Sequence, residues 1–270
     1  MRALIVWSLV TISSLVRSQE LFVITDPASN VPAGSLSVRL SNSMFKEVFE
    51  PGYNYHLMPE ITYGVNKNLM IRTSAFISNR SNSLYGEGAN IFAKYRFYSM
   101  DDIHSHLRMA VFARYSLNRA DIHQEQIEIM GHNTGFEAGA VITQLVHKVA
   151  ISSSASIERA TDNNPNYEFP DVQGNTAVNY TLSVGKLMYP KTYKTFKETN
   201  INLMLELAGQ TITENGKTYL DVVPSIQFIF NSQSRIDIGY RRELYSNMIR
   251  TAPNGLYLNL EYTFFNVGVR

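Results

Sequence analysis

The feature that most constrains this chain is an alternation of apolar and polar residues that recurs along it from Ser35 onward. Each alternating segment is about ten or more residues long, and Asn, Gly, Ser, Asp or Lys clusters separate one segment from the next. None of the segments has a convincing helical period. We predict about twelve strands, at 35–46, 55–66, 68–79, 85–98, 106–118, 134–146, 149–160, 176–189, 200–212, 218–230, 235–246 and 255–267.

Strand length decides between two all-β architectures. Strands of soluble β-sandwiches are usually about five or six residues long, and the predicted strands are about twice that length. An even number of long strands, apolar on one face and polar on the other, is typical of an outer-membrane barrel, because only closure satisfies every backbone group in a bilayer. We therefore predict an all-β fold, a transmembrane antiparallel up-and-down β-barrel of about 12 strands spanning 35–270.

Composition agrees with this prediction. Charged residues make up 17% of the chain, against roughly 25% in an ordinary soluble domain. The 24 Lys and Arg nearly balance the 23 Asp and Glu, which argues against a nucleic-acid partner. The absence of Cys excludes disulfides, thiolate nucleophiles and zinc-thiolate sites.

Loop lengths and aromatic residues predict the orientation of the barrel. Connections such as 147–148 are short, as periplasmic turns are, whereas 119–133 and 161–175 are long, as extracellular loops are. Aromatic residues on the predicted lipid-facing side fall into two girdles, one at each end of the strands. Pro59 and Pro224 interrupt strands and predict a bulge at each position.

The residues before the barrel divide into two parts for which we predict different roles. Arg2 followed by an apolar run to Val16 and small residues before Gln19 predicts a secretory signal peptide at 1–18. Residues 19–34 are hydrophilic, and we expect either a periplasmic N-terminal segment or a small plug.

Several motifs resemble those of a known class of protein. They are Glu20–Ala33 with its Asp26–Asn30 run, Lys94–Tyr98, Asp102–His106 and Gly131–Gly135. With these motifs the chain resembles Bacteroidota-type outer-membrane β-barrel proteins described as porin-like transporters, and the resemblance covers nearly the whole mature chain. It implies a location in the bacterial outer membrane, but it names no substrate. The ending Leu260–Phe265 resembles the signal read by the barrel-assembly machinery, which would be a partner.

Parity places a set of charged residues inside the predicted barrel. Cations dominate the first five strands and carboxylates dominate the remaining strands. Such charges persist only if they pair or face water, so two interpretations stay open: a filled lumen cross-linked by salt bridges, or a water-filled pore between opposed basic and acidic walls. The pore predicts porin-like passage of a small polar solute through a barrel embedded in outer-membrane lipids. The predicted lumen residues are Arg39, Glu60, Arg72, Lys94, Arg96, Arg108, Arg114, Glu137, Glu158, Glu206, Asp237, Arg241, Glu243 and Glu261.

Histidines offer two weaker hypotheses. His104, His106 and His147 meet at the predicted periplasmic rim and could bind zinc or copper; a solvated polar turn is the alternative, and we otherwise expect no cofactor. His132 and Thr134 share the parity of the lipid-facing residues after them, in an arrangement similar to the outward-facing His and Ser of the outer-membrane phospholipase A family. Thr replaces the expected Ser, so we predict that the chain is not an enzyme and keep a lipid-acting hydrolase as the alternative.

Overall fold

The computed structural model describes residues 22–48, 51–79, 83–102, 105–164, 168–170, 173–190 and 198–267. The predicted signal peptide at 1–18 lies outside these residues. The described part forms twelve strands: β1 (Leu36–Lys46), β2 (Tyr53–Gly64), β3 (Leu69–Ser78), β4 (Tyr85–Asp101), β5 (Ser105–Asn118), β6 (Thr134–Val146), β7 (Val149–Thr161), β8 (Thr176–Tyr189), β9 (Asn200–Ile212), β10 (Thr218–Phe230), β11 (Ser234–Ser246) and β12 (Asn254–Phe264). Within the same residues, no helix has the length and apolarity needed to cross a bilayer.

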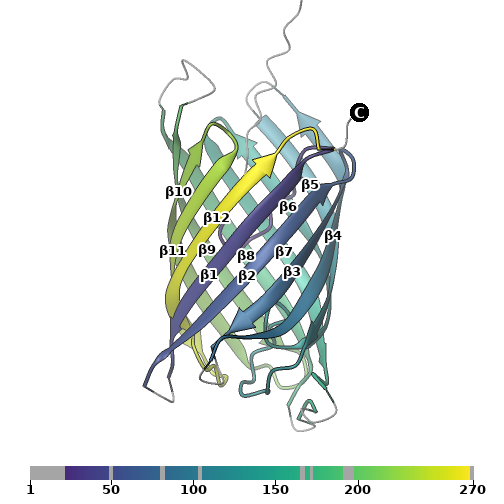
Figure 1. Cartoon of the computed structure of the whole chain (residues 1–270), viewed down its shortest axis with the longest axis vertical. Coiled ribbons are helices and arrows are strands. Elements are labelled where there is room, and N and C mark those ends of the chain that lie inside the picture. The colour runs from purple at the N-terminus through teal and green to yellow at the C-terminus, as the bar shows by residue number, and fades with distance from the viewer. Residues whose placement is uncertain are drawn as a thin grey trace, which may run out of the picture.

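The strands close into one antiparallel barrel, which confirms the predicted fold class (Figure 1). Each strand pairs with the next along the chain, and β1 pairs with β12 in a register that runs from Leu36 opposite Phe264 to Lys46 opposite Asn254. Closure removes the free sheet edges that would otherwise leave backbone groups unpaired. We call the end where β1 begins and β12 ends the terminal rim, and the opposite end, which carries the 119–133 connection, the loop rim.

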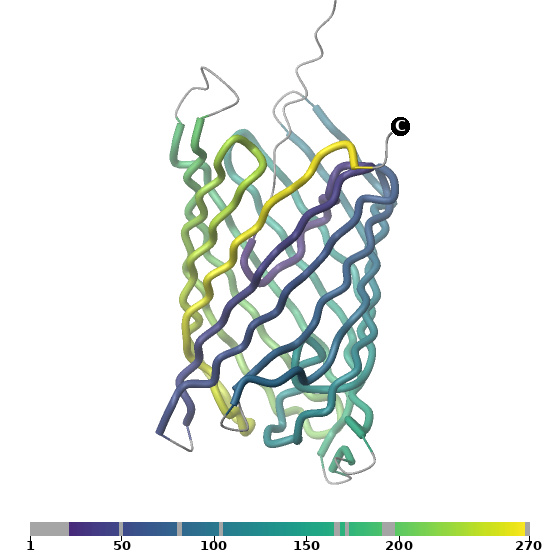
Figure 2. The backbone as a smooth tube through the Cα atoms, viewed as in Figure 1, coloured from purple at the N-terminus to yellow at the C-terminus, as the bar shows by residue number. Residues whose placement is uncertain are grey.

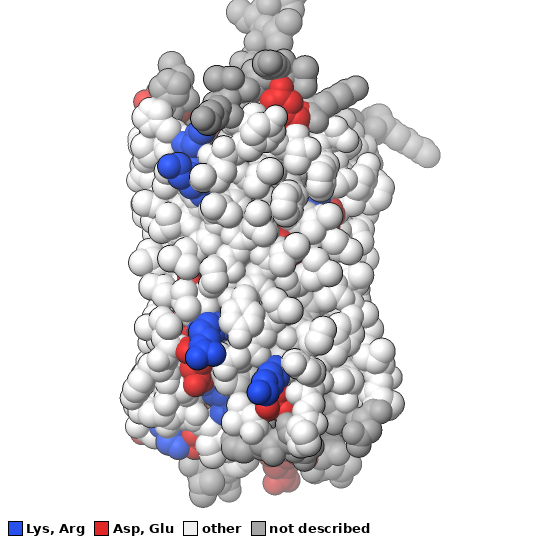
Figure 3. Space-filling view, turned by 90° about the vertical axis from the view of Figure 1, so that its left-hand side faces the viewer, with Lys and Arg blue, Asp and Glu red and all other residues white. Residues whose placement is uncertain are grey.

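The outer surface of the barrel is apolar. Side chains such as Val38, Val111, Leu205 and Leu258 point outward and are about half exposed. Figure 3 shows one face on which charged residues gather toward the two ends and leave a broad middle that is almost entirely uncharged. An apolar belt of this extent is stable in contact with lipid and not with water.

Exposed aromatic side chains mark the borders of this belt. Tyr63 and Phe264 lie near the terminal rim, while Tyr115 and Phe136 lie near the loop rim, and all four are exposed. Aromatic rings favour these two levels because one part of the interface is apolar and the other is hydrated. The predicted pair of girdles is present in these four residues.

The predicted bulges at the two prolines are wrong. Pro59 and Pro224 each stay in register with the neighbouring strand on one side, opposite Leu40 and Leu205 respectively. On the other side the pairing skips the proline and resumes in the same register, because the missing N–H costs one ladder bond without adding a residue. The register shifts instead lie at Phe76/Ile77, Arg96/Tyr98, Leu187/Tyr189 and Leu220/Asp221.

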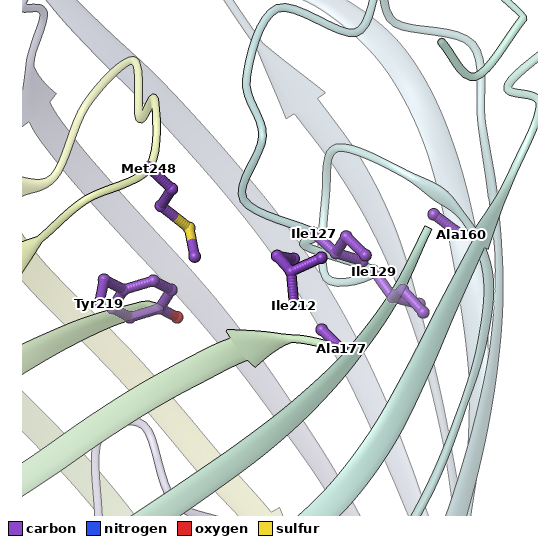
Figure 4. Packing of buried hydrophobic residues seen from close by; sticks show 7 residues of the cluster. All are labelled: Ile127, Ile129, Ala160, Ala177, Ile212, Tyr219 and Met248. Atoms are coloured by element: carbon purple, nitrogen blue, oxygen red, sulfur yellow. The ribbon is translucent and has the colours of Figure 1, made fainter. Parts of the chain in front are cut away.

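An apolar cluster lies in the interior near the loop rim. Figure 4 shows the residues that form it: Ile127, Ile129, Ala160, Ala177, Ile212, Tyr219 and Met248. Ile127 and Ile129 belong to the 119–133 connection, whereas Ile212 and Tyr219 come from β9 and β10. The connection is therefore folded inward and buried against the far wall.

Candidate functional site

The lumen holds a cavity of about 1010 Å³. Arg96 and Asp102 line it near the terminal rim, and Glu128 and His132 line it near the loop rim. The cavity therefore reaches from one end region of the barrel to the other. Its walls combine charged side chains with buried aromatic rings.

Most of the residues predicted for the lumen line this cavity. They are Arg39, Glu60, Arg72, Lys94, Arg96, Arg108, Arg114, Glu137, Glu158, Arg241 and Glu261. The remaining three also point inward but are covered by other groups. Glu206 lies beneath the N-terminal segment, Asp237 beneath Arg235, and Glu243 pairs with Arg250.

The wall charges of the described residues pair mainly between neighbouring strands, as in the first of the two interpretations, a lumen cross-linked by salt bridges. Arg114 NH1 lies 2.7 Å from Glu137 Oε2 on the adjacent strand. Arg235 NH2 lies 2.7 Å from Glu261 Oε2. Antiparallel register places these side chains directly opposite one another, so the Coulomb attraction is satisfied along the wall.

Aromatic residues on the inner face are a correction, because we expected that face to be polar or charged. Phe92 of β4 is fully buried, and it packs against Phe112 of β5 with ring centroids 5.7 Å apart. The guanidinium carbons of Arg72 and Arg114 lie 5.1 and 5.0 Å from the Phe92 ring centroid. Cation–π contacts with the Phe92 ring thus restrict the side chains of both arginines and offset part of the entropy that these long side chains lose when they are ordered.

The N-terminal segment, Phe22–Gly34, lies inside the barrel (Figure 2). Phe22 and Val23 pack on the inward-facing Leu145, Ala150 and Met204. These wall residues are apolar at positions where alternation predicts polar side chains, and the segment covers them. Burial of a Phe or Val side chain contributes roughly 1.5–3 kcal/mol, so these contacts stabilise the segment in its position inside the barrel. We call the wall patch of Leu145, Ala150 and Met204 the apolar seat of the segment.

Glu206 of β9 holds the backbone of the segment. Its carboxylate accepts hydrogen bonds from the N–H groups of Val23 (2.7 Å), Ile24 (3.2 Å) and Thr25 (2.8 Å). The carboxylate is fully buried. A buried carboxylate that lacks hydrogen bonds is costly, and three backbone donors meet that need here.

Asp26 holds the opposite side of the segment. Its two oxygens accept a forked pair of hydrogen bonds from Arg72 of β3, at 2.7 and 2.9 Å. Lys94 Nζ of β4 lies 3.6 Å from Asp26 and donates to the carbonyl of Pro27 at 2.6 Å. The segment therefore bridges the basic side of the lumen to Glu206 on the acidic side.

The segment leaves the lumen at the terminal rim through a close contact with β2. Gly34 N donates to Gly64 O at 2.8 Å. A Cβ at Gly64 would stand 2.2 Å from the Pro32 carbonyl oxygen, so only glycine allows this approach. The exit is thereby fixed in position.

The 119–133 connection narrows the lumen at the loop rim. Gln210 of β9 accepts a hydrogen bond from Ile127 N (2.9 Å) and donates one to Ile127 O (2.7 Å). Glu125 pairs with Lys217 and accepts from Ile249 N. Partial burial opposes ionisation, but the Lys217 ammonium and the Ile249 N–H outweigh it and hold the pKa of Glu125 below its ordinary value of 4.5.

Arg250 fastens the same connection from the β11–β12 loop. Its guanidinium binds the fully buried Asp221 at 2.7 Å, Glu243 at 2.9 Å and the side-chain oxygen of Gln126 at 2.6 Å. The guanidinium also stacks over the Tyr219 ring at 3.8 Å. One loop residue thus ties two wall carboxylates to the inward-folded connection.

The predicted metal residues give no assembled metal site among the described residues. His106 Nδ1 lies 2.9 Å from Asp101 Oδ1, a contact that a polar turn also makes. Across the described chain, no group of three or more His, Cys, Asp or Glu is arranged to hold a metal ion. His147 has a positive φ of 56° in the β6–β7 turn, and His104 lies outside the described residues. The zinc or copper site stays a prediction.

His132 and Thr134 are engaged with other groups and are not arranged as a dyad. Thr134 Oγ1 donates to Asn118 O at 3.1 Å and accepts from Asn118 N at 2.8 Å. His132 Nε2 lies 3.3 Å from Glu128, and its ring stacks on His56 in the lumen. His132 therefore lies inside the barrel and not on the lipid-facing surface that the hydrolase alternative requires.

Sequence reasoning missed several charged residues of this site. Asp221 and Arg235 share the inward parity of Val223 and Asp237, so alternation could have found both. Asp26 and Arg250 lie in segments without a strand period; the plug alternative for residues 19–34 would place Asp26 in the lumen, but alternation identifies neither side chain as a partner of the wall.

No family model matches this chain, and no curated protein sequence matches it. Solved structures do match. The KdgM porin has a TM-score of 0.50 at 8% identity, over 84% of this chain and 99% of that chain. An outer-membrane channel from Pseudomonas putida F1 has a TM-score of 0.56 at 11% identity, over 88% of this chain and 98% of that one. At these identities the similarity establishes a shared fold, that of bacterial outer-membrane channels.

Proposed function

We propose that this protein is a porin-like channel of the bacterial outer membrane that passes small polar solutes. The observation that carries this proposal is the continuous, charge-lined cavity of about 1010 Å³ inside a barrel whose exterior is apolar. A lumen lined by both signs of charge suits hydrated solutes, because it offers hydrogen-bond partners in exchange for water. The resemblance to Bacteroidota-type barrels and a route through the barrel-assembly machinery belong to the same proposal.

Two narrow regions limit the size of the solute. The N-terminal segment occupies the half of the lumen near the terminal rim, and the 119–133 connection narrows the half near the loop rim. Barrels of about twelve strands stand between small filled barrels and wide porins. We therefore expect passage of small solutes and exclusion of large ones.

Solute flux into proteoliposomes tests the proposal. Vesicles that contain the protein should swell in isotonic glycerol or arabinose faster than protein-free vesicles, and the rate should fall steeply as the solute grows. Equal swelling of the two kinds of vesicle with every solute would refute the channel.

A neighbouring pair of substitutions provides a matched control. Ser154 of β7 lines the cavity, whereas Ala155 beside it is exposed on the outer face. Ser154→Trp should slow flux severalfold because it fills the cavity, and Ala155→Trp should leave flux unchanged because its ring faces lipid. Equal effects of the two variants would place the pathway elsewhere.

A filled barrel without transport is the second candidate, and the seated N-terminal segment favours it. The segment and its salt bridges would then serve only to stiffen the wall. That candidate predicts no flux from the complete chain and none after the segment is released. We do not propose a lipid hydrolase, because His132 lines the lumen and the Thr134 hydroxyl is hydrogen-bonded to the backbone of Asn118.

A further inference from the structure

We propose that Arg72 and Lys94 form a carboxylate-binding site in the lumen and that Asp26 of the N-terminal segment is its built-in occupant, so that an acidic solute competes with the segment for the site. This inference deepens the proposed function, because it names a solute class and the residues that recognise it. It rests on geometry that is independent of whether the barrel conducts.

The Arg72–Asp26 pair has the geometry with which proteins recognise free carboxylates. Two N–H groups of one guanidinium meet the two oxygens of one carboxylate at 2.7 and 2.9 Å. A forked pair of this kind specifies a planar, bidentate anion. Arg72 also lies over the Phe92 ring, and its Nε donates a hydrogen bond to the Thr62 hydroxyl at 3.1 Å. The guanidinium is thus oriented by the wall and not only by Asp26.

Charge on the wall shows that the site needs an anion from outside the strands. Among the described residues, the wall carboxylate within 4 Å of Arg72 is that of Glu60, at 3.6 Å, and Arg39 contacts the same carboxylate at the same distance. Lys94 is buried, and among the described residues the carboxylate within ion-pair distance of its ammonium is that of Asp26. Without Asp26, Arg72 would keep the longer contact with Glu60 that it shares with Arg39, and Lys94 would lose its carboxylate partner. An uncompensated buried charge is strongly unfavourable.

The site is reachable by a solute. Asp26, Arg72 and Lys94 all line the cavity, and the Asp26 side chain keeps a quarter of its surface exposed. A dissolved carboxylate can therefore approach from the cavity side. It would replace Asp26 bond for bond and free the segment on its basic side, leaving Glu206 and the apolar seat as the remaining attachments.

Thiol labelling tests the competition without any need for conduction. The chain has no Cys, so Thr25→Cys gives a single probe at a buried position next to Asp26. In the full-length, detergent-solubilised protein, this thiol should react slowly with a water-soluble methanethiosulfonate. Succinate at constant ionic strength should speed the reaction at least tenfold and saturably, while its uncharged isostere succinamide should not.

Variants in the Thr25→Cys background separate the ligand from the site. Asp26 lies outside the strands, so Asp26→Asn should leave the barrel folded. In the absence of succinate, this variant should be labelled at least tenfold faster than the parent. Arg72→Gln should also label fast but should lose the response to succinate. Asp121→Asn, an exposed carboxylate of the 119–133 connection, is the control and should match the parent.

Three results would overturn the proposal: equal acceleration by succinate and succinamide, a parent-like rate for Asp26→Asn, or an undiminished succinate response in Arg72→Gln. Inorganic phosphate is the third probe, and a response equal to that of succinate would overturn the assignment to carboxylates. A barrel that passes no solute but shows the succinate response would refute the channel and leave the site standing. A conducting barrel without that response would do the reverse.

Discussion

Replacement of Glu206 by Gln should release the N-terminal segment from the acidic side of the lumen. The carboxylate accepts short hydrogen bonds from Val23 N at 2.7 Å and Thr25 N at 2.8 Å, one on each oxygen. A Gln side chain keeps one oxygen as a neutral acceptor and turns an amide NH₂ toward the other N–H. One charge-assisted bond is therefore weakened, and the other is lost.

The size of the effect follows from these two bonds. A hydrogen bond to a charged group contributes about 1.5–3 kcal/mol and a neutral one about 0.5–1.5 kcal/mol. Weakening one bond by about 1 kcal/mol and losing another of about 2 kcal/mol raises the free energy of the seated segment by about 3 kcal/mol. At 1.36 kcal/mol for each factor of ten, the unseated population should rise by about 150-fold. Hydration of the free carboxylate after release reduces this gain, and we expect no less than about tenfold.

The assay is the labelling rate of Thr25→Cys, with Glu158→Gln as the matched control. Glu158 is also a buried wall carboxylate, but its bond is to Gln210 of the wall and not to the segment. Glu206→Gln should label at least about tenfold faster than Glu158→Gln. Rates within twofold of each other would refute the conclusion that Glu206 holds the segment.

Three further predictions concern the loop rim and the outer wall. Arg250→Ala should lower the free energy of unfolding by about 3 kcal/mol, because Asp221 loses two charged hydrogen bonds, whereas the exposed Arg242→Ala should change the urea midpoint little. The pKa of Glu125 is lowered in the folded protein, so the ion pair between Glu125 and Lys217 stabilises the 119–133 connection above about pH 4.5 and is lost as the pH falls below that value. The labelling rate of Gln126→Cys should therefore rise as the pH is lowered through that range. Glu125→Gln should remove this pH dependence. Val111→Lys should destabilise the barrel in lipid vesicles by about 2–4 kcal/mol, as a lysine at mid-bilayer does, while Ser154→Lys in the lumen should cost clearly less, and equal costs in urea titrations would contradict the assignment of the two faces.

The strands and their faces follow from the sequence because one physical requirement sets both. A closed barrel in lipid demands alternation over about ten residues, and the pattern from Leu36 to Phe264 meets that demand strand by strand. The same parity places Arg39, Glu60 and Arg114 inside. Pro59 and Pro224 were predicted to bulge, but a missing donor does not force an extra residue into the strand.

The contents of the lumen could not be read in the same way. Which charges pair depends on the register between strands. Alternation excludes a slip of one residue, but a slip of two residues keeps both faces and changes the charge pairs. Asp26 and Arg250 reach the lumen from segments without periodicity, so their partners Arg72 and Asp221 become clear only in three dimensions. Phe92 is an apolar residue on the inner face, where alternation predicts polar side chains, and it packs against the guanidinium groups of two arginines.

Planar-bilayer conductance of the complete chain and of a variant lacking residues 22–34 tests the central claim most directly. Removal of the segment takes away the apolar contacts of Phe22 with the wall. Arg72 and Lys94 lose the Asp26 carboxylate, and Glu206 loses the backbone N–H groups that it accepts from. We expect small steps from the complete chain and larger, ohmic steps from the variant, with selectivity shifted toward anions because the charge of Asp26 is gone. Absence of conductance from both proteins at every voltage would contradict the central claim.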